Sequence, residues 1–310
     1  MKRFRLLLPA LCLTLLFAFC LSGCTVHRAE PETAAVTPLF WEVTSPDGTG
    51  TLYLFGSVHV AKPDTYPLPD AIEDAFASSD CLAVEFDTIA FQQDPALMQE
   101  AAGLMIYTDG TTIRDHLDSE TYELALAAMK DAGLYKNYME IYRPAMWCSL
   151  LDSETVEKAG YIGENGIDVH FLTEAHETGK RVVEVESALE QYRMLTGFSE
   201  ETDALLLKSS CESVPEEMDE LYAMWCSGDE AAFTAYVFEE PDGLTDAERE
   251  VYAGYVKTMF DDRNDQMAKT ALELVQSGET CFFVVGTAHM LGERGIVSQL
   301  RSAGCEIIRR

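Results

Sequence analysis

Short apolar runs alternate with longer amphipathic stretches along most of the chain. Runs at 40–43 and 51–55, joined by the turn signal Ser45-Pro46-Asp47-Gly48, predict a β-hairpin whose second strand is apolar enough to be central. Four more strands are predicted at 81–86, 181–185, 281–285 and 305–308. Helical periodicity fills 68–78, 94–104, 119–132, 143–158 and 167–178. This alternation predicts an α/β fold with a central mixed β-sheet flanked by helices.

Residues from about 190 to 277 carry helical patterns without a convincing strand. We therefore expect a helical insertion or cap before the last strands. No stretch of the sequence resembles a linker between domains, so residues 39–310 are expected to form one domain.

The first 24 residues are typical of an export signal. A basic segment is followed by the apolar stretch 6–21, which is short for a membrane span. The stretch ends in Leu21-Ser22-Gly23-Cys24, which resembles a bacterial lipobox, a motif whose cysteine carries lipid. The alternative is an ordinary cleaved signal with an incidental cysteine at this position.

This segment predicts where the protein acts. We expect a signal peptide at 1–24, lipid on Cys24, and a polar tether at 25–38. The protein would then be exported and anchored to the outer face of the cell membrane by that lipid alone, because its acidic surface is repelled by anionic headgroups.

The charge balance excludes one class of partner. The 310 residues contain 22 Lys and Arg against 53 Asp and Glu, a formal net charge of -31. A nucleic-acid interface needs a basic face, so nucleic acid is not expected to be a main partner.

Six cysteines remain outside the signal and the lipobox. There is no C-x-x-C motif, and Cys81 and Cys281 open apolar strands, where a thiol behaves as a small hydrophobe. We expect mostly free, buried thiols, and a single disulfide would also fit.

Two segments repeat one pattern, Gly56-Ser57-Val58-His59 and Gly286-Thr287-Ala288-His289. Each follows an apolar strand, and the carboxyl ends of strands form the ligand-binding crevice of open α/β sheets. A single histidine in such a context is more often a satisfied loop or core residue. Two matched ones among six histidines predict a pair that meets across adjacent strands.

Acidic residues accompany two of the predicted strands. Glu85 lies near the end of a buried strand, where an isolated charge costs roughly several kcal/mol, so it must be paired, metal-bound or catalytic. Glu184 and Glu186 are expected to share one face of their strand. A half-exposed strand with solvated acids fits these two equally well.

These features resemble the TraB/PrgY/GumN family, which includes the Tiki proteases. The similarity runs from about Phe40 to the C-terminus, and its most specific part is the ending with Gly286, His289, Gly292 and Gly295. The other segments that carry it are Gly56 to His59, Glu85, Gly166-Ile167-Asp168, 179–186 and Arg263-Asn264. Cys305 stands where the family usually has an aromatic residue, a departure that touches packing only.

The resemblance implies a fold related to erythromycin-esterase-like and ChaN-like proteins and, as in the Tiki members, a metal-dependent peptidase. The implied active-site residues are His59, Glu85 and His289, with Arg263 and Asn264 as polar supports. Two imidazoles and a carboxylate would leave open positions on a divalent cation (Mn, Co, Fe or Zn) for water and a substrate carbonyl.

Two further roles follow from this chemistry. Glu186 is a candidate general base or a partner of the ligands. Arg263 is a candidate for binding a substrate carboxylate or a developing oxyanion, since a guanidinium offers a fixed fork of donors.

The sequence thus favours a metal-dependent hydrolase, a peptidase acting on extracytoplasmic peptides. One alternative keeps the same residues without metal, as an esterase-like hydrolase with a histidine as general base. Another is a non-catalytic surface lipoprotein that binds or sequesters a peptide or haem. The expected partner is a peptide or small-molecule substrate, whose identity no motif reveals.

Overall fold

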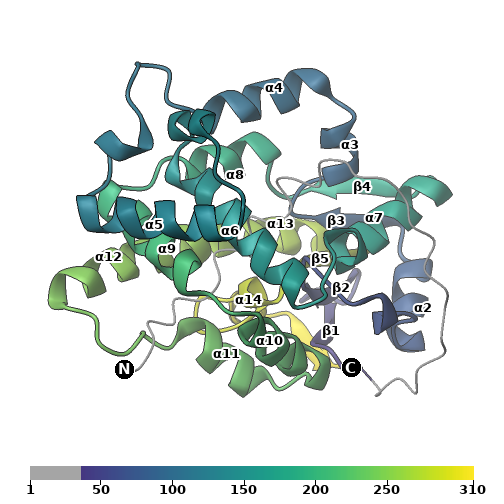
Figure 1. The fold of residues 1–310 in the computed structure, drawn as a ribbon. Coiled ribbons are helices and arrows are strands. Elements are labelled where there is room, and N and C mark those ends of the chain that lie inside the picture. The colour runs from purple at the N-terminus through teal and green to yellow at the C-terminus, as the bar shows by residue number, and fades with distance from the viewer. Residues whose placement is uncertain (1–35) are drawn as a thin grey trace.

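The computed structural model describes residues 36–310 (Figure 1). The predicted signal peptide, Cys24 and most of the predicted tether lie outside the described residues, so those expectations stay predictions. Within the described part, no helix combines the length and apolar character that a membrane crossing requires.

A mixed sheet forms the centre of the fold, as the sequence predicts. Within residues 36–310 its strands lie in the order β4-β3-β5-β2-β1-β6. β2, β3, β4 and β5 pair in parallel, whereas β1 is antiparallel to both β2 and β6. The strands are β1 (Phe40–Thr44), β2 (Thr51–Ser57), β3 (Cys81–Val84), β4 (Arg181–Glu184), β5 (Thr280–Gly286) and β6 (Glu306–Arg309).

All six predicted strands are present, but two end earlier than predicted. β3 ends at Val84 and β4 at Glu184, so Glu85 follows its strand instead of lying within it, and Glu186 lies two residues past the end of β4. The reason lies at Asp87, whose side chain accepts a hydrogen bond from Ala90 N and thereby caps the next helix. The chain has to leave the sheet before that cap.

Helices fill both long connections, from β3 to β4 and from β4 to β5. Between β3 and β4 lie α3 (Thr88–Gln92), α4 (Pro95–Leu104), α5 (Ser119–Asp131), α6 (Pro144–Lys158) and α7 (Ile167–Thr178). Between β4 and β5 lie α8 (Ala188–Leu195), α9 (Glu200–Glu212), α10 (Pro215–Ser227), α11 (Glu230–Phe238), α12 (Asp246–Val256), the π-helical turn Lys257–Asp261 and α13 (Asp262–Gln276). The remaining helices are α2 (Asp70–Ser78), α14 (Thr287–Met290) and α15 (Ile296–Ser302).

The helical insertion expected before the last strands is present, since 188–276 contains no strand. It does not stand alone, because α9 packs against α5 and α6 from the earlier connection. Figure 1 shows α5, α6, α9 and α12 gathered on one side of the molecule and the sheet on the other. The helical layer is therefore built from two segments, of which the sequence pattern singled out one.

An aromatic cluster holds α2 and α7 against the sheet. Phe76 of α2, Phe171 of α7 and Phe282 of β5 are almost fully buried. The ring centroids of Phe171 and Phe282 lie 4.8 Å apart, and those of Phe76 and Phe171 lie 4.9 Å apart. Such pairs contribute about 0.5–1.5 kcal/mol each beyond the area they bury. This packing fixes the position of α7, whose first turn reaches the candidate site.

The cysteine prediction is confirmed for the described residues. All six thiols are free, and four of them are buried, namely Cys81, Cys148, Cys281 and Cys305.

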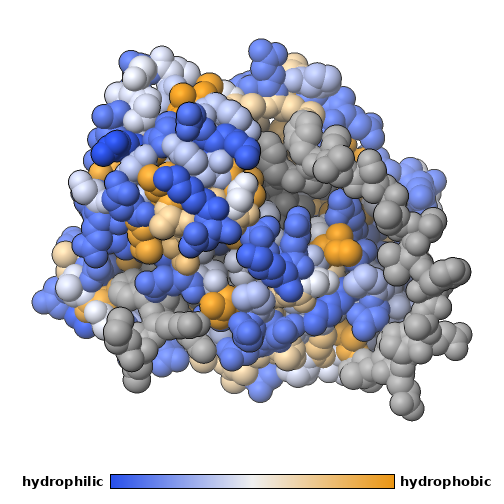
Figure 2. All heavy atoms as spheres, viewed as in Figure 1, coloured by the Kyte–Doolittle hydropathy of each residue, from blue (hydrophilic) through white to orange (hydrophobic). Residues whose placement is uncertain are grey.

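The surface seen in Figure 2 is mostly hydrophilic, with hydrophobic residues scattered over it.

Candidate active site

The predicted histidines and Glu85 meet at the carboxyl ends of three adjacent strands. His59 follows β2, His289 lies on α14 directly after β5, and Glu85 follows β3. Because β3, β5 and β2 are neighbours in the sheet, their ends converge. All three side chains are buried, with 2%, 2% and 6% of their surface exposed.

Gly286 lies at the centre of this group. A Cβ at this position would be 3.4 Å from Glu85 Oε1, 3.5 Å from His59 Nε2 and 3.6 Å from His289 Cδ2. The Gly286 amide also donates to Glu85 Oε1 at 2.9 Å. Because Gly286 has no side chain, the space between the three side chains stays open.

Gly56 allows the start of α14 to approach β2 closely, since a Cβ at Gly56 would lie 2.8 Å from Thr287 Oγ1.

The other two motif glycines lie further along the chain. Gly292 adopts a left-handed conformation with φ +81°, and Gly295 precedes α15 and donates to the Gly292 carbonyl. They shape the turn between α14 and α15 and do not reach the site.

Glu85 is held in its ionised form. Its Oε2 accepts from Arg263 Nη2 at 2.7 Å and from Gln191 Nε2 at 2.9 Å. Burial alone would raise the pKa of Glu85, but the Arg263 guanidinium, aided by the two imidazoles and the Gly286 amide, holds that pKa well below its usual range. A carboxylate is therefore available next to both histidines.

Asp168 orients His59. Its Oδ2 accepts from His59 Nδ1 at 2.8 Å, and its Oδ1 accepts from Ser57 Oγ at 2.8 Å. With the proton on Nδ1, Nε2 is directed towards Glu85 Oε1, 3.9 Å away. A carboxylate behind an imidazole is the arrangement that fixes the tautomer of metal-bound or general-base histidines.

His289 is oriented by a different group. Its Nδ1 donates to Asn264 Oδ1 at 2.6 Å, because an amide oxygen only accepts. Burial and the nearby Arg263 lower the pKa of His289 to about 3. The ring is therefore neutral at neutral pH, as a metal ligand must be.

Arg263 and Glu186 form a buried pair beside Glu85. Arg263 Nε and Nη2 donate to the two oxygens of Glu186 at 2.8 and 2.7 Å, and Nη1 donates to the Met259 carbonyl at 3.3 Å. Gln191 Nε2 bridges Glu85 and Glu186. This geometry favours Arg263 as the charge partner of Glu85 and Glu186 as the group that positions Arg263.

Consecutive residues Arg263 and Asn264 reach the site from the start of α13. The π-helical turn Lys257–Asp261 comes directly before that helix. π-Turns occur often at functional sites, because they change which side chains a helix presents.

Glu184 takes another role than Glu186. Its Oε1 accepts from the Asp87 amide at 2.8 Å, at the cap of α3. The two acids predicted to share a face thus serve different contacts, because the strand ends between them.

Sequence reasoning gave no role to two of the contacting residues. Asp168 was visible only as part of the Gly-Ile-Asp segment, where Gly166 is needed because a Cβ there would lie 2.2 Å from the His59 carbonyl oxygen. Gln191 lies on α8 in no motif, and only the fold brings it to Glu85.

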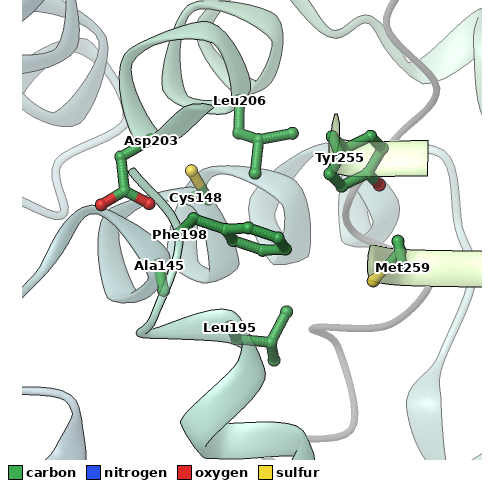
Figure 3. A pocket seen from close by; sticks show the side chains of 8 residues that line it. All are labelled: Ala145, Cys148, Leu195, Phe198, Asp203, Leu206, Tyr255 and Met259. Carbon is green, nitrogen blue, oxygen red and sulfur yellow. The ribbon is translucent and has the colours of Figure 1, made fainter. Parts of the chain in front are cut away.

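An apolar pocket adjoins the site in the helical layer. In Figure 3 the side chains of Leu195, Phe198 and Leu206 surround a common space, with Tyr255 and Met259 opposite them. Leu195 lies one turn after Gln191 on α8, and the Met259 carbonyl accepts from Arg263. The cavity measures only about 10 Å³, which is no more than the space of one water molecule, so these side chains pack the helical layer beside the polar cluster and leave no room for a bound group.

The spacing of donor atoms bears on metal binding. In residues 36–310, the group of three whose ligand atoms all lie within 4.8 Å of one another is Glu73, His170 and Glu174. The His59, Glu85 and His289 donors form no set this tight. They suit a cation by their chemistry, and the three would have to draw together to share one ion, since ligands bind it at about 2 Å.

The fold and the site define an α/β protein that presents two oriented imidazoles and an ionised glutamate at the carboxyl edge of its parallel strands. The chain belongs to the TraB/PrgY/gumN family, which it matches over residues 39–309.

The curated relatives include two proteins of Danio rerio. The chain is 24% identical to Metalloprotease TIKI2 over 86% of its length, and 23% identical to Metalloprotease TIKI1 over 92%. It covers 60% and 65% of those two proteins. It is also 24% identical to the uncharacterized protein YbaP of Escherichia coli (strain K12), over 53% of this chain and 59% of that protein. No solved structure matches.

Proposed function

We propose that this protein is a metal-dependent hydrolase, specifically a peptidase that acts on extracytoplasmic peptides. The observation that carries the proposal is the convergence of His59, Glu85 and His289 around Gly286, with each imidazole oriented by its own partner. Similarity to two metalloproteases supports the same chemistry.

Each residue has a role in this proposal. His59, Glu85 and His289 would hold a divalent cation of the Mn, Co, Fe or Zn class, which when bound acidifies water and polarises a carbonyl. Asp168 fixes the tautomer of His59, and Asn264 fixes that of His289. Arg263 keeps Glu85 ionised.

A metal-independent hydrolase is the second candidate. The contact of 2.8 Å between His59 Nδ1 and Asp168 is that of a general base with its orienting carboxylate. The wide spacing of the three donor atoms also favours this reading. In it, His59 activates water for attack on an ester or amide.

Chelation separates these candidates. We expect the purified protein to cleave members of a peptide library that includes apolar side chains, to lose this activity in EDTA, and to regain it with Mn, Co or Zn added singly. The double variant His59→Asn/His289→Asn provides the control, and it should bind one metal equivalent fewer than the unaltered protein. Activity that survives EDTA would support the metal-independent hydrolase, and saturable peptide binding without cleavage under any metal would support the binding-protein alternative.

We also propose that the protein works outside the cytoplasm, anchored by lipid at Cys24. The basic segment, the apolar stretch and the lipobox support this. Mass spectrometry of the mature N-terminus should find a diacylated or triacylated Cys24, and Cys24→Ser should release the protein from membranes. An unmodified N-terminus, or a variant that stays on the membrane, would reject the anchor.

A further inference from the structure

Glu73 of α2 and His170 and Glu174 of α7 form a second group of potential ligands. Their ligand atoms all lie within 4.8 Å of one another, and each residue is partly buried. His170 and Glu174 are four residues apart and therefore share one face of α7. The packing of Phe76 on Phe171 holds α2 beside that face. None of these three residues contacts Glu85, His59 or His289 through a hydrogen bond described above.

His170 is the residue that suggests a ligand. Its Nε2 is shielded from solvent and has no hydrogen-bond partner among the described residues. The nearest carboxylate oxygen, Glu73 Oε1, is 3.6 Å away, too far for a hydrogen bond. The ring is held in place by stacking on Tyr66, with centroids 4.3 Å apart. A buried nitrogen left unpaired is costly, and a cation would use its lone pair.

We propose that Glu73, His170 and Glu174 bind a divalent transition-metal cation, with Zn²⁺ as the representative ion. One imidazole favours such ions over Ca²⁺ and Mg²⁺, and two carboxylates balance a double positive charge. Ligand atoms bound at about 2 Å lie about 3.4 Å apart in a tetrahedral site, close to the distance of 3.6 Å between His170 Nε2 and Glu73 Oε1. Partial exposure of all three residues lets water complete the coordination.

The cation would clamp two elements of the fold. α2 follows the loop that carries His59, and Asp168 lies in the first turn of α7, two residues before His170. Joining α2 to α7 would therefore brace both partners of the contact between His59 and Asp168. The proposal does not depend on a metal at the candidate active site.

The test uses Zn²⁺ and a chain whose active-site histidines are removed. We expect the variant His59→Asn/His289→Asn to retain one Zn²⁺ per chain by elemental analysis. Its melting temperature should rise by about 5 °C when free Zn²⁺ exceeds Kd 100-fold. Adding His170→Asn and Glu174→Gln should abolish both the bound Zn²⁺ and the rise. His176→Asn, on the same helix and outside the cluster, is the matched control and should change neither.

Either of two outcomes would overturn the proposal. One is a Zn²⁺ content and a melting shift that survive His170→Asn/Glu174→Gln. The other is an equal loss of stability in that variant with and without Zn²⁺, which would identify a plain ion pair. Should the active-site background fail to fold, the same substitutions are made in the unaltered protein. There the proposal requires the loss of one Zn²⁺ equivalent, and an unchanged content rejects it.

Discussion

Replacing Glu85 with glutamine is expected to lower turnover by about 10⁴-fold or more while the protein stays folded. The amide removes the negative charge of the ligand that we propose between the two imidazoles. Arg263 keeps both oxygens of Glu186, so no buried charge is left without a partner. The side-chain oxygen of the glutamine can still accept from the Gly286 amide. Its NH2 group then faces the Arg263 and Gln191 donors, which lowers stability without unfolding the protein. The measurement is kcat/KM on a cleaved peptide, with thermal unfolding to verify the fold.

Glu184→Gln is the matched control. It makes the same chemical change two residues from Glu186, but at the α3 cap, so activity should change little. The kcat/KM of Asp168→Asn should lie between those of the other two variants, about 10–100-fold below that of the unaltered protein. This substitution disturbs the orientation of His59 but leaves all three proposed ligands in place. Full turnover by Glu85→Gln would contradict the proposed role, as would an equal loss in Glu184→Gln.

The sequence reveals those parts of the site that follow from strand pattern. An apolar run that ends in Gly-x-x-His marks a strand and its carboxyl end together, so His59 and His289 could be placed at one edge of the sheet. Glu85 could be found because a charge at the end of an apolar run needs a partner. These signals are local, and the parallel order of β2, β5 and β3 converts them into proximity.

The remaining contacts depend on packing between distant segments, which leaves no periodic signal. Gln191 looks like an ordinary polar residue of an amphipathic helix until α8 is placed over Glu85. Glu73 and His170 are brought together only because Phe76 and Phe171 pack on the same side of the sheet. The helical repeat of 3.6 residues does show that His170 and Glu174 share one face of their helix. It does not show which helix lies opposite that face.

A second large effect, on the stability of the protein, is expected when Asp152 in the helical layer is replaced. This residue of α6 is fully buried, and neither carboxylate oxygen has a hydrogen-bond partner among the described residues. Burial raises the pKa of Asp152 to about 8. The nearby Ser210 hydroxyl offsets this rise only in part, because it makes no hydrogen bond of normal geometry with the carboxyl group. Cys148 also faces the group. The native protein therefore keeps this carboxyl protonated at neutral pH.

The sign of the pH dependence follows from the proton count. Between pH 3.8, the ordinary pKa, and about 8, the unfolded chain has lost a proton that the folded chain retains. The contribution of this carboxyl group to the free energy of unfolding is therefore fully present below pH 3.8. It falls as pH rises, by about 1.4 kcal/mol per pH unit at most. Asp152→Asn keeps the shape of the neutral carboxyl and cannot ionise. The free energy of unfolding of the Asp152→Asn variant should exceed that of the unaltered protein by almost nothing at pH 4 and by about 5 kcal/mol at pH 8.

Urea unfolding of both proteins at pH 5, 6.5 and 8 measures this difference in the free energy of unfolding. Glu157→Gln, an exposed position on the same helix, is the control and should give a small difference that does not change with pH. The expected signature is thus a stabilisation that is specific to residue 152 and increases with pH. An Asp152→Asn protein that is less stable than the unaltered one at pH 8 would show that the ionised carboxylate is bound in the native state, because only a bound charge would lose by becoming an amide.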